Sequence, residues 1–234
     1  MIRCAALGAT IAAASSVAAA PECRLALVLA IDVSASIDAD EYRLQQNGLA
    51  AALTSQDVQN AILGGSGHVA IAVFEWSGRQ QHKTIADWTI LSSQQSISGV
   101  AAQIVASDYN PKRHATSLGH SIMESGRILE KAPQCARRVV DISGDGVNND
   151  GFGPDIAFEI ARLENVTVNG LAIEADNPNL ARYYSTHVAR GPGSFVERAA
   201  DFEDFERAMT LKLFREISDI KIGAITPIHD APNL

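Results

Sequence analysis

A carboxylate and two hydroxyls stand at alternate positions in the run Asp32-Val33-Ser34-Ala35-Ser36. The run follows the apolar residues 25–31, whose length and composition predict a buried strand. The oxygen atoms of Asp32, Ser34 and Ser36 would then gather where that strand ends, at one edge of a sheet. Oxygen ligands of this kind suit a hard divalent cation, so the run predicts part of a metal site.

Two more polar positions could complete this site. Thr116 opens a segment with helical spacing, and Asp145 follows the predicted strand 137–142. In an open parallel sheet, ligands bind outside the carboxyl ends of the strands, where the strand order reverses. Mg²⁺ takes few carboxylates and keeps several waters, so such a ligand set would leave coordination positions open. The plainer alternative makes Asp32 and Ser34 ordinary turn and cap residues.

Together these residues resemble the metal-ion-dependent adhesion site, or MIDAS, of von Willebrand factor type A (VWA) domains. The resemblance covers roughly residues 25–215, and the segment 143–149, Ser-Gly-Asp-Gly-Val-Asn-Asn, is similar to an uncharacterised exported bacterial branch. It implies that the hydroxyls bind the metal directly or nearly so and that the carboxylates act largely through water. Those hydroxyls are Ser34, Ser36 and Thr116, and the carboxylates are Asp32 and Asp145. An acidic residue of a partner protein usually fills the remaining position on the metal.

Nearby polar side chains have simpler interpretations. Asp38 and Asp40 precede a helical segment and are expected to cap it. His114 and His120 flank Thr116, where a histidine could serve as a catalytic base. We expect instead a solvated loop histidine and a histidine on a helix surface.

Enzyme motifs are incomplete in this chain. An aspartyl-phosphate phosphatase would need a second Asp where Ser34 stands. The segment Gly64-Gly65-Ser66-Gly67-His68 lacks the last glycine of a nucleophile elbow. Asn149 stands where a dinucleotide fingerprint beginning at Gly144 needs its third glycine. A metal-dependent phosphate or ester hydrolase is the alternative function, and a structural module with a degenerate metal site is the third.

Strand-like and helix-like segments alternate along the chain. The expected strands are residues 24–31, 68–76, 84–91, 137–142, 166–173 and 194–197. The expected helices are residues 38–55, 58–63, 93–106, 118–129, 156–163, 180–188 and 202–213. This pattern and the resemblance predict a doubly wound α/β fold of the VWA type, with helices on both faces. Its six-stranded sheet is mostly parallel, and a hairpin turn at residues 77–80 makes one edge strand antiparallel.

Composition places the chain among globular proteins. It has 234 residues, of which 47% are hydrophobic and 20% charged, and its formal net charge is −8. Its longest basic run is Arg137-Arg138, so nucleic acid and anionic membrane surfaces are not expected partners. A negative surface would also repel an acidic ligand, so any attraction must be local to the metal.

The first twenty residues have the pattern of a cleaved signal peptide. Residues 1–20 carry the single charge Arg3, then a small-residue apolar stretch, then a segment typical of signal-peptidase cleavage. A membrane anchor, the alternative, would need about twenty strongly apolar residues. We therefore expect residues 21–217 to form a VWA-like domain, exported to the periplasm or secreted, with no membrane span after cleavage and a tail at residues 218–234.

Cleavage would leave two cysteines, Cys23 and Cys135. An even pair in an exported protein suggests a disulfide. Each cysteine lies just before an apolar run, residues 25–31 and 139–142, so the two strand starts would lie side by side if those strands are neighbours, as in the VWA fold. Two free, buried thiols are the alternative.

The residues and the resemblance thus predict an exported MIDAS-type binding domain. It would hold Mg²⁺, or else Mn²⁺ or Ca²⁺, and capture a carboxylate of a protein partner whose identity the sequence does not indicate.

Overall fold

The computed structural model describes residues 23–109, 114–161 and 163–218. The predicted signal peptide, residues 1–20, lies outside the described residues, and so does the predicted tail after Ser218. No helix among the described residues is long and apolar enough to cross a membrane.

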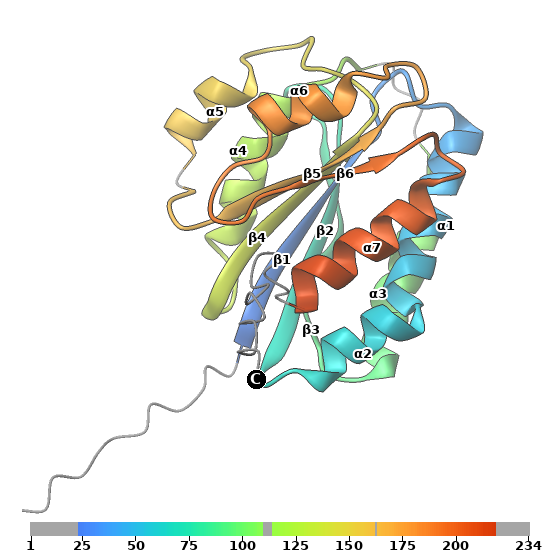
Figure 1. Cartoon of the computed structure of the whole chain (residues 1–234), viewed down its shortest axis with the longest axis vertical. Coiled ribbons are helices and arrows are strands. Elements are labelled where there is room, and N and C mark those ends of the chain that lie inside the picture. Colours follow the sequence, from blue (N-terminus) through green and yellow to red (C-terminus); the bar gives the residue numbers. More distant parts are fainter. Residues whose placement is uncertain (1–22, 110–113, 162, 219–234) are drawn as a thin grey trace, which may run out of the picture.

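A six-stranded sheet forms the centre of the molecule, in the order β3-β2-β1-β4-β5-β6 (Figure 1). Its strands are β1 (Cys23–Asp32), β2 (His68–Trp76), β3 (His82–Leu91), β4 (Cys135–Gly144), β5 (Thr167–Ile173) and β6 (Val196–Ala199). Neighbouring strands are parallel, except that β3 runs antiparallel to β2 at one edge. The predicted fold class is confirmed. The strand order in the sheet reverses between β1 and β4, and this reversal places a crevice at the carboxyl ends of these two strands.

Helices cover both faces of this sheet (Figure 1). One face carries α1 (Ala39–Thr54), α2 (Gln56–Gly64), α3 (Gln94–Val105) and α7 (Phe205–Ser218), and the other carries α4 (Leu118–Leu129), α5 (Pro154–Ile160) and α6 (Leu180–His187). The central strands are therefore buried on both faces, which explains their nearly continuous apolar sequences.

Most element boundaries lie within two residues of the prediction, and the larger differences are at the ends of α5 and α7. α5 ends at Ile160 rather than at residue 163, because Ala161 is extended and the chain turns to pack Leu163 against the core. β6 starts two residues later than expected, because the Ser194 N–H donates to the Gly191 carbonyl at 3.3 Å within the preceding turn. α7 starts at Phe205 rather than at residue 202, and it ends at Ser218 rather than at residue 213.

β1 is the strand that positions the predicted site. Leu25, Leu27 and Leu29 point to the face that carries α1 and α7, whereas Ala26 and Val28 point to the opposite face, and all five are fully buried. Burial of both faces holds this strand in one register, so the position of Asp32 at its end is determined by the core.

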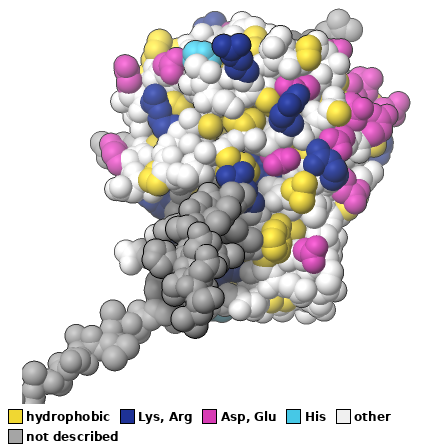
Figure 2. All heavy atoms as spheres, viewed as in Figure 1, with side chains coloured by type: hydrophobic (Ala, Val, Ile, Leu, Met, Phe, Trp, Pro, Cys, Tyr) yellow, Lys and Arg dark blue, Asp and Glu magenta, His cyan; other side chains and the backbone are white. Residues whose placement is uncertain are grey.

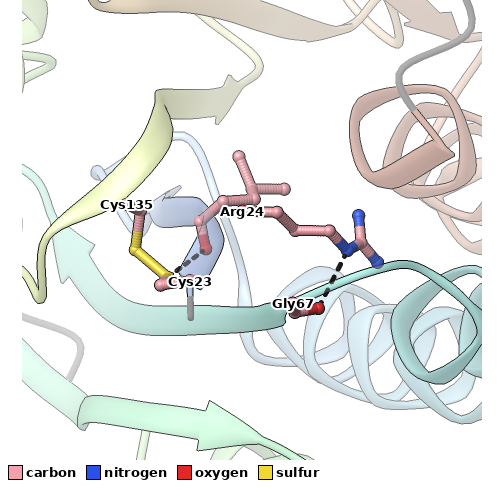
Figure 3. Close-up of a disulfide and its surroundings, with 5 residues drawn as sticks. Cys23, Arg24, Gly67 and Cys135 are labelled. Atoms are coloured by element: carbon pink, nitrogen blue, oxygen red, sulfur yellow. Dashed lines mark hydrogen bonds between the residues drawn. A yellow bond between two sulfur atoms is a disulfide. The ribbon is translucent and has the colours of Figure 1, made fainter. Parts of the chain in front are cut away.

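The other end of β1 is covalently attached to β4. Cys23 and Cys135 are paired in the sheet register and form a disulfide with their Cα atoms 4.5 Å apart (Figure 3). The predicted disulfide is confirmed, and the alternative of two free thiols is wrong. Arg24 turns away from the bridge and donates to the carbonyl of Gly67 at 3.3 Å and to that of Ile217 at 2.6 Å. The start of the central strand is thus bonded to its neighbours on two sides.

Candidate metal centre

Asp32 lies at the carboxyl end of β1, and its side chain is fully buried. Its Oδ1 accepts a hydrogen bond from the Ser34 main-chain N–H at 2.8 Å, and its own main-chain carbonyl accepts one from Gln45 Nε2 at 3.2 Å. Its Oδ2 is also shut off from solvent but has no hydrogen-bond partner among the described residues. One oxygen of this carboxylate is therefore used to hold the turn, and the other is available to a ligand.

The three predicted hydroxyls and the second carboxylate lie in a chain of contacts. Thr116 Oγ1 donates to Ser34 Oγ at 3.1 Å, the Oγ atoms of Ser34 and Ser36 are 3.4 Å apart, and Ser36 Oγ donates to Asp145 Oδ1 at 2.9 Å. Ser34 is buried, whereas Ser36 is exposed. The structure therefore brings all five predicted site residues together where β1 and β4 end, with one side open to solvent.

The loop after β4 holds Thr116 in place. Asn149 Oδ1 accepts from the Thr116 main-chain N–H at 2.8 Å, and the Thr116 carbonyl accepts from the main-chain N–H groups of Asn149 at 2.9 Å and Asp150 at 3.2 Å. On the other side, the Ala35 N–H donates to the His114 carbonyl at 2.8 Å. Main-chain bonds to both neighbouring loops thus position the Thr116 hydroxyl beside Ser34.

Both carboxyl groups of the site are hard to ionise as they stand. Burial raises the pKa of Asp32 well above its usual range, and the nearby Asp145 charge raises it further. Burial also raises the pKa of Asp145, which the hydrogen bond from Ser36 partly offsets. Two neighbouring carboxylates and three hydroxyls form a set of hard oxygen ligands that fits a divalent cation. The positive charge of such a cation would offset the repulsion between the two carboxylates.

His, Cys, Asp and Glu side chains form no metal-binding cluster of three or more in the described part of the chain. The candidate centre differs from such clusters because most of its members are hydroxyls.

Acidic groups surround the open side of the centre. Asp38 caps α1 as predicted, accepting from the N–H groups of Asp40 at 2.8 Å and Glu41 at 3.0 Å. The pKa of Glu41 is raised by burial and by the charges of Asp38, Asp145 and Asp176. Figure 2 shows carboxylates gathered along the edge where the N-terminal end of α1 lies. The field at this edge attracts cations.

A family model described as "Protein of unknown function (DUF1194)" matches residues 22–221. The chain belongs to the DUF1194 family. A search of curated proteins finds no match to it.

Solved structures place this DUF1194 chain in the VWA fold. Proximal thread matrix protein 1 (PTMP1) of the mussel byssus superimposes with a TM-score of 0.59 at 16% identity, covering 82% of this chain and 47% of that one. A von Willebrand factor type A protein from Catenulispora acidiphila superimposes with a TM-score of 0.57 at 16% identity, covering 84% of this chain and 42% of that one. The pilus adhesin SpaC from Lactobacillus rhamnosus GG superimposes with a TM-score of 0.62 at 13% identity, covering 84% of this chain and 31% of that one. The DUF1194 chain thus spans less than half of each of these chains. Another PTMP1 structure has a zinc-occupied MIDAS motif.

His114, predicted as a solvated loop histidine, is partly buried, and so is His120, which was predicted on a helix surface. The His120 ring lies against the Phe152 ring, with centroids 4.1 Å apart, and burial lowers the pKa of its imidazole. Packing is therefore the observed role of His120.

Three supporting residues escaped the sequence prediction. Gln45 bonds to the Asp32 carbonyl, Asn149 bonds to Thr116, and Tyr184 lies beside the end of β4. Only Asn149 carried a signal, as part of the loop motif that follows β4. The other two lie on helices where their spacing indicates packing alone.

Proposed function

We propose that this DUF1194 protein is an exported binding domain that captures a carboxylate of a protein partner through a divalent cation. The residues that would hold the cation are Asp32, Ser34, Ser36, Thr116 and Asp145. The observation that carries the proposal is the chain of contacts from Thr116 through the serines to Asp145, beside the unpartnered Oδ2 of Asp32.

The chemistry of these side chains favours capture of an outside anion. A bound Mg²⁺ would supply local positive charge and coordination positions that protein groups leave open. Ser34, Ser36 and Thr116 are neutral, so they add no negative charge of their own. Asp32 and Asp145 are the two carboxylates of the set, and the hydroxyl of Ser36 already donates to Asp145. The exposed Ser36 lies on the side from which a partner would approach.

The similar structures support a role in protein interaction. PTMP1, one of the structures of the same fold, has a zinc-occupied MIDAS motif, and SpaC is a pilus adhesin. Mn²⁺ and Ca²⁺ are further candidates besides Mg²⁺, because the same oxygen ligands suit them.

Export is part of the proposal. The disulfide between Cys23 and Cys135 would form and persist in an oxidising compartment such as the periplasm or the extracellular space. The predicted signal peptide at residues 1–20 supports the same compartment.

Metal titration of matched serine variants tests the site. Ser34→Ala should weaken Mg²⁺ and Mn²⁺ binding at least about tenfold in calorimetry, because it removes a ligand and breaks the chain of contacts. Ser125→Ala is the matched control, since Ser125 is also a buried serine but bonds to the Ser121 carbonyl within α4. Equal metal affinity of wild type and Ser34→Ala would refute the assignment.

Two further measurements separate the alternatives. A pull-down from the exported proteome with the wild-type protein should recover a partner that chelator releases and that Asp32→Ala fails to bind. Turnover of a generic phosphate or ester substrate, lost in Ser34→Ala, would instead favour the hydrolase. A wild-type protein that binds no divalent cation would favour the structural module.

A further inference from the structure

A buried tyrosine reaches the candidate metal centre from the layer of helices formed by α4, α5 and α6. Tyr184 lies on α6, its side chain is fully buried, and its ring passes over Gly170 of β5. A Cβ atom at Gly170 would be 2.7 Å from Tyr184 Cδ1, so a larger residue there would displace the ring. The absence of a side chain on β5 thus makes room for the phenol.

A second glycine makes room for the hydroxyl. A Cβ atom at Gly144, the last residue of β4, would be 2.6 Å from Tyr184 Oη and 2.7 Å from Asp32 Oδ2. The two oxygens therefore face the same small space over Gly144. Because both oxygens lie within 2.7 Å of that one Cβ position, they are close enough together for one water to bridge them.

Both oxygens lack a partner. Tyr184 Oη and Asp32 Oδ2 are each shut off from solvent, and neither has a hydrogen-bond partner among the described residues. Burying a polar atom without a partner is unfavourable, so two such atoms facing one space indicate a hydrogen bond that the protein atoms alone leave open.

We infer that Tyr184 is a positioning residue of the metal site, whose hydroxyl holds Asp32 Oδ2 through one water in the space over Gly144. The inference rests on the proposed function, because Asp32 is one of the proposed cation-holding residues. With Oδ1 bonded to the Ser34 N–H and one lone pair of Oδ2 accepting from this water, the carboxylate is held at both oxygens, and Oδ2 keeps a second lone pair for the cation. The phenol O–H is the donor of this contact.

This role differs from simple core packing. The aromatic ring already fills the space beside Gly170, so packing alone would be satisfied by phenylalanine. The hydroxyl is what a packing role leaves unexplained, and Tyr184→Phe removes that group alone. Tyr42→Phe is the matched control, since Tyr42 is also buried but donates to Glu75 Oε1 at 2.6 Å on the other face of the sheet.

Titration with Mn²⁺ of the wild type and these two variants tests the inference. Tyr184→Phe should bind Mn²⁺ about tenfold or more weakly, the size typical of a lost supporting contact, while its melting temperature without metal stays that of the wild type. Tyr42→Phe should retain wild-type affinity. A tyrosine difference spectrum on metal addition should be present in the wild type and in Tyr42→Phe but absent in Tyr184→Phe.

A second substitution fills the same space. Gly144→Ala places a methyl group against both oxygens and should weaken Mn²⁺ binding although the tyrosine is intact. Wild-type affinity and an unchanged difference spectrum in Tyr184→Phe would overturn the inference while leaving the metal site standing. A wild-type protein that binds no Mn²⁺ or Mg²⁺ would overturn the metal site and this inference together.

Discussion

Lys212 Nζ of α7 lies 2.8 Å from Asp141 Oδ1 of β4, and both side chains are buried. Lys212 also pairs with Glu216 Oε1 at 2.5 Å, and Asn169 Nδ2 donates to that same oxygen at 2.7 Å. The contact with Asp141 is an ion pair without hydrogen-bond alignment, since neither Asp141 oxygen has a hydrogen-bond partner among the described residues. A charged cluster thus joins α7 to β4 and β5 within an apolar layer.

Removal of the lysine should destabilise the fold strongly. Lys212→Met leaves two buried carboxyl groups without their cation, and we expect a loss of about 3–5 kcal/mol in the free energy of unfolding, measured with urea. Arg127→Met is the control, because the Arg127 pair with Glu124 is exposed on the arginine side and contributes less than about 1 kcal/mol. Similar losses in both variants would contradict this role for Lys212.

Asp141 should make stability depend on pH. Burial, with the charge of Glu216, raises its pKa from 3.8 to about 7 against the opposing effect of Lys212. The folded state therefore binds this proton more tightly than the unfolded state. The stabilisation from this bound proton is complete at pH values below the pKa of Asp141 in the unfolded chain. It is lost as pH rises through about 7, and the free energy of unfolding falls by up to about 1.4 kcal/mol per unit of pH.

The Asp141→Asn variant isolates this effect. Between pH 5 and pH 8 the free energy of unfolding of the wild type should fall more steeply than that of the variant, as followed by urea denaturation across about three pH units. Parallel curves for the two proteins would show that Asp141 does not titrate in this range.

Reduction of the disulfide should weaken the whole domain. The bridge joins residues with a sequence separation of 112. On the loop-entropy model its loss costs about 4–5 kcal/mol, so a reducing agent should lower the melting temperature of the wild type. The double variant Cys23→Ser/Cys135→Ser should start from the lower value and be insensitive to the reductant. A wild type whose melting temperature is unaffected by complete reduction would contradict the prediction.

Two helix glycines should respond to alanine in opposite directions. A Cβ atom at Gly119 of α4 would clash with the Phe152 carbonyl oxygen, and the Gly119 N–H donates to Asn148 Oδ1 at 3.2 Å. Gly119→Ala should therefore cost about 1–3 kcal/mol and weaken metal binding by displacing the loop after β4.

Gly99 of α3 is the control for that substitution. A Cβ atom there meets nothing within 4 Å, so Gly99→Ala should stabilise the helix by about 0.5–1 kcal/mol without affecting metal binding. Thermal unfolding and Mn²⁺ titration check both variants. Equal effects at the two positions would show that the approach of α4 to the loop is unimportant.

Much of the fold could be predicted from local patterns. The apolar run before Asp32 indicates a strand buried on both faces, and the alternation of such runs with helical segments indicates a doubly wound sheet, because side-chain periodicity reports burial directly. Asp32, Ser34, Ser36, Thr116 and Asp145 could be grouped because parallel strands end at the same edge. The positions of Cys23 and Cys135 before two such strands indicated the disulfide for the same reason.

Other features were decided only by packing between distant segments. Asp141 lies within a strand that reads as apolar, and its partners Lys212 and Glu216 are on a helix whose spacing indicates an ordinary core face. Tyr184 faces Asp32 because two strands between them carry glycines at the points of contact. Sequence periodicity tells which face a side chain occupies. It does not tell which buried polar atoms from different layers meet there, since that depends on how the helices seat on the sheet.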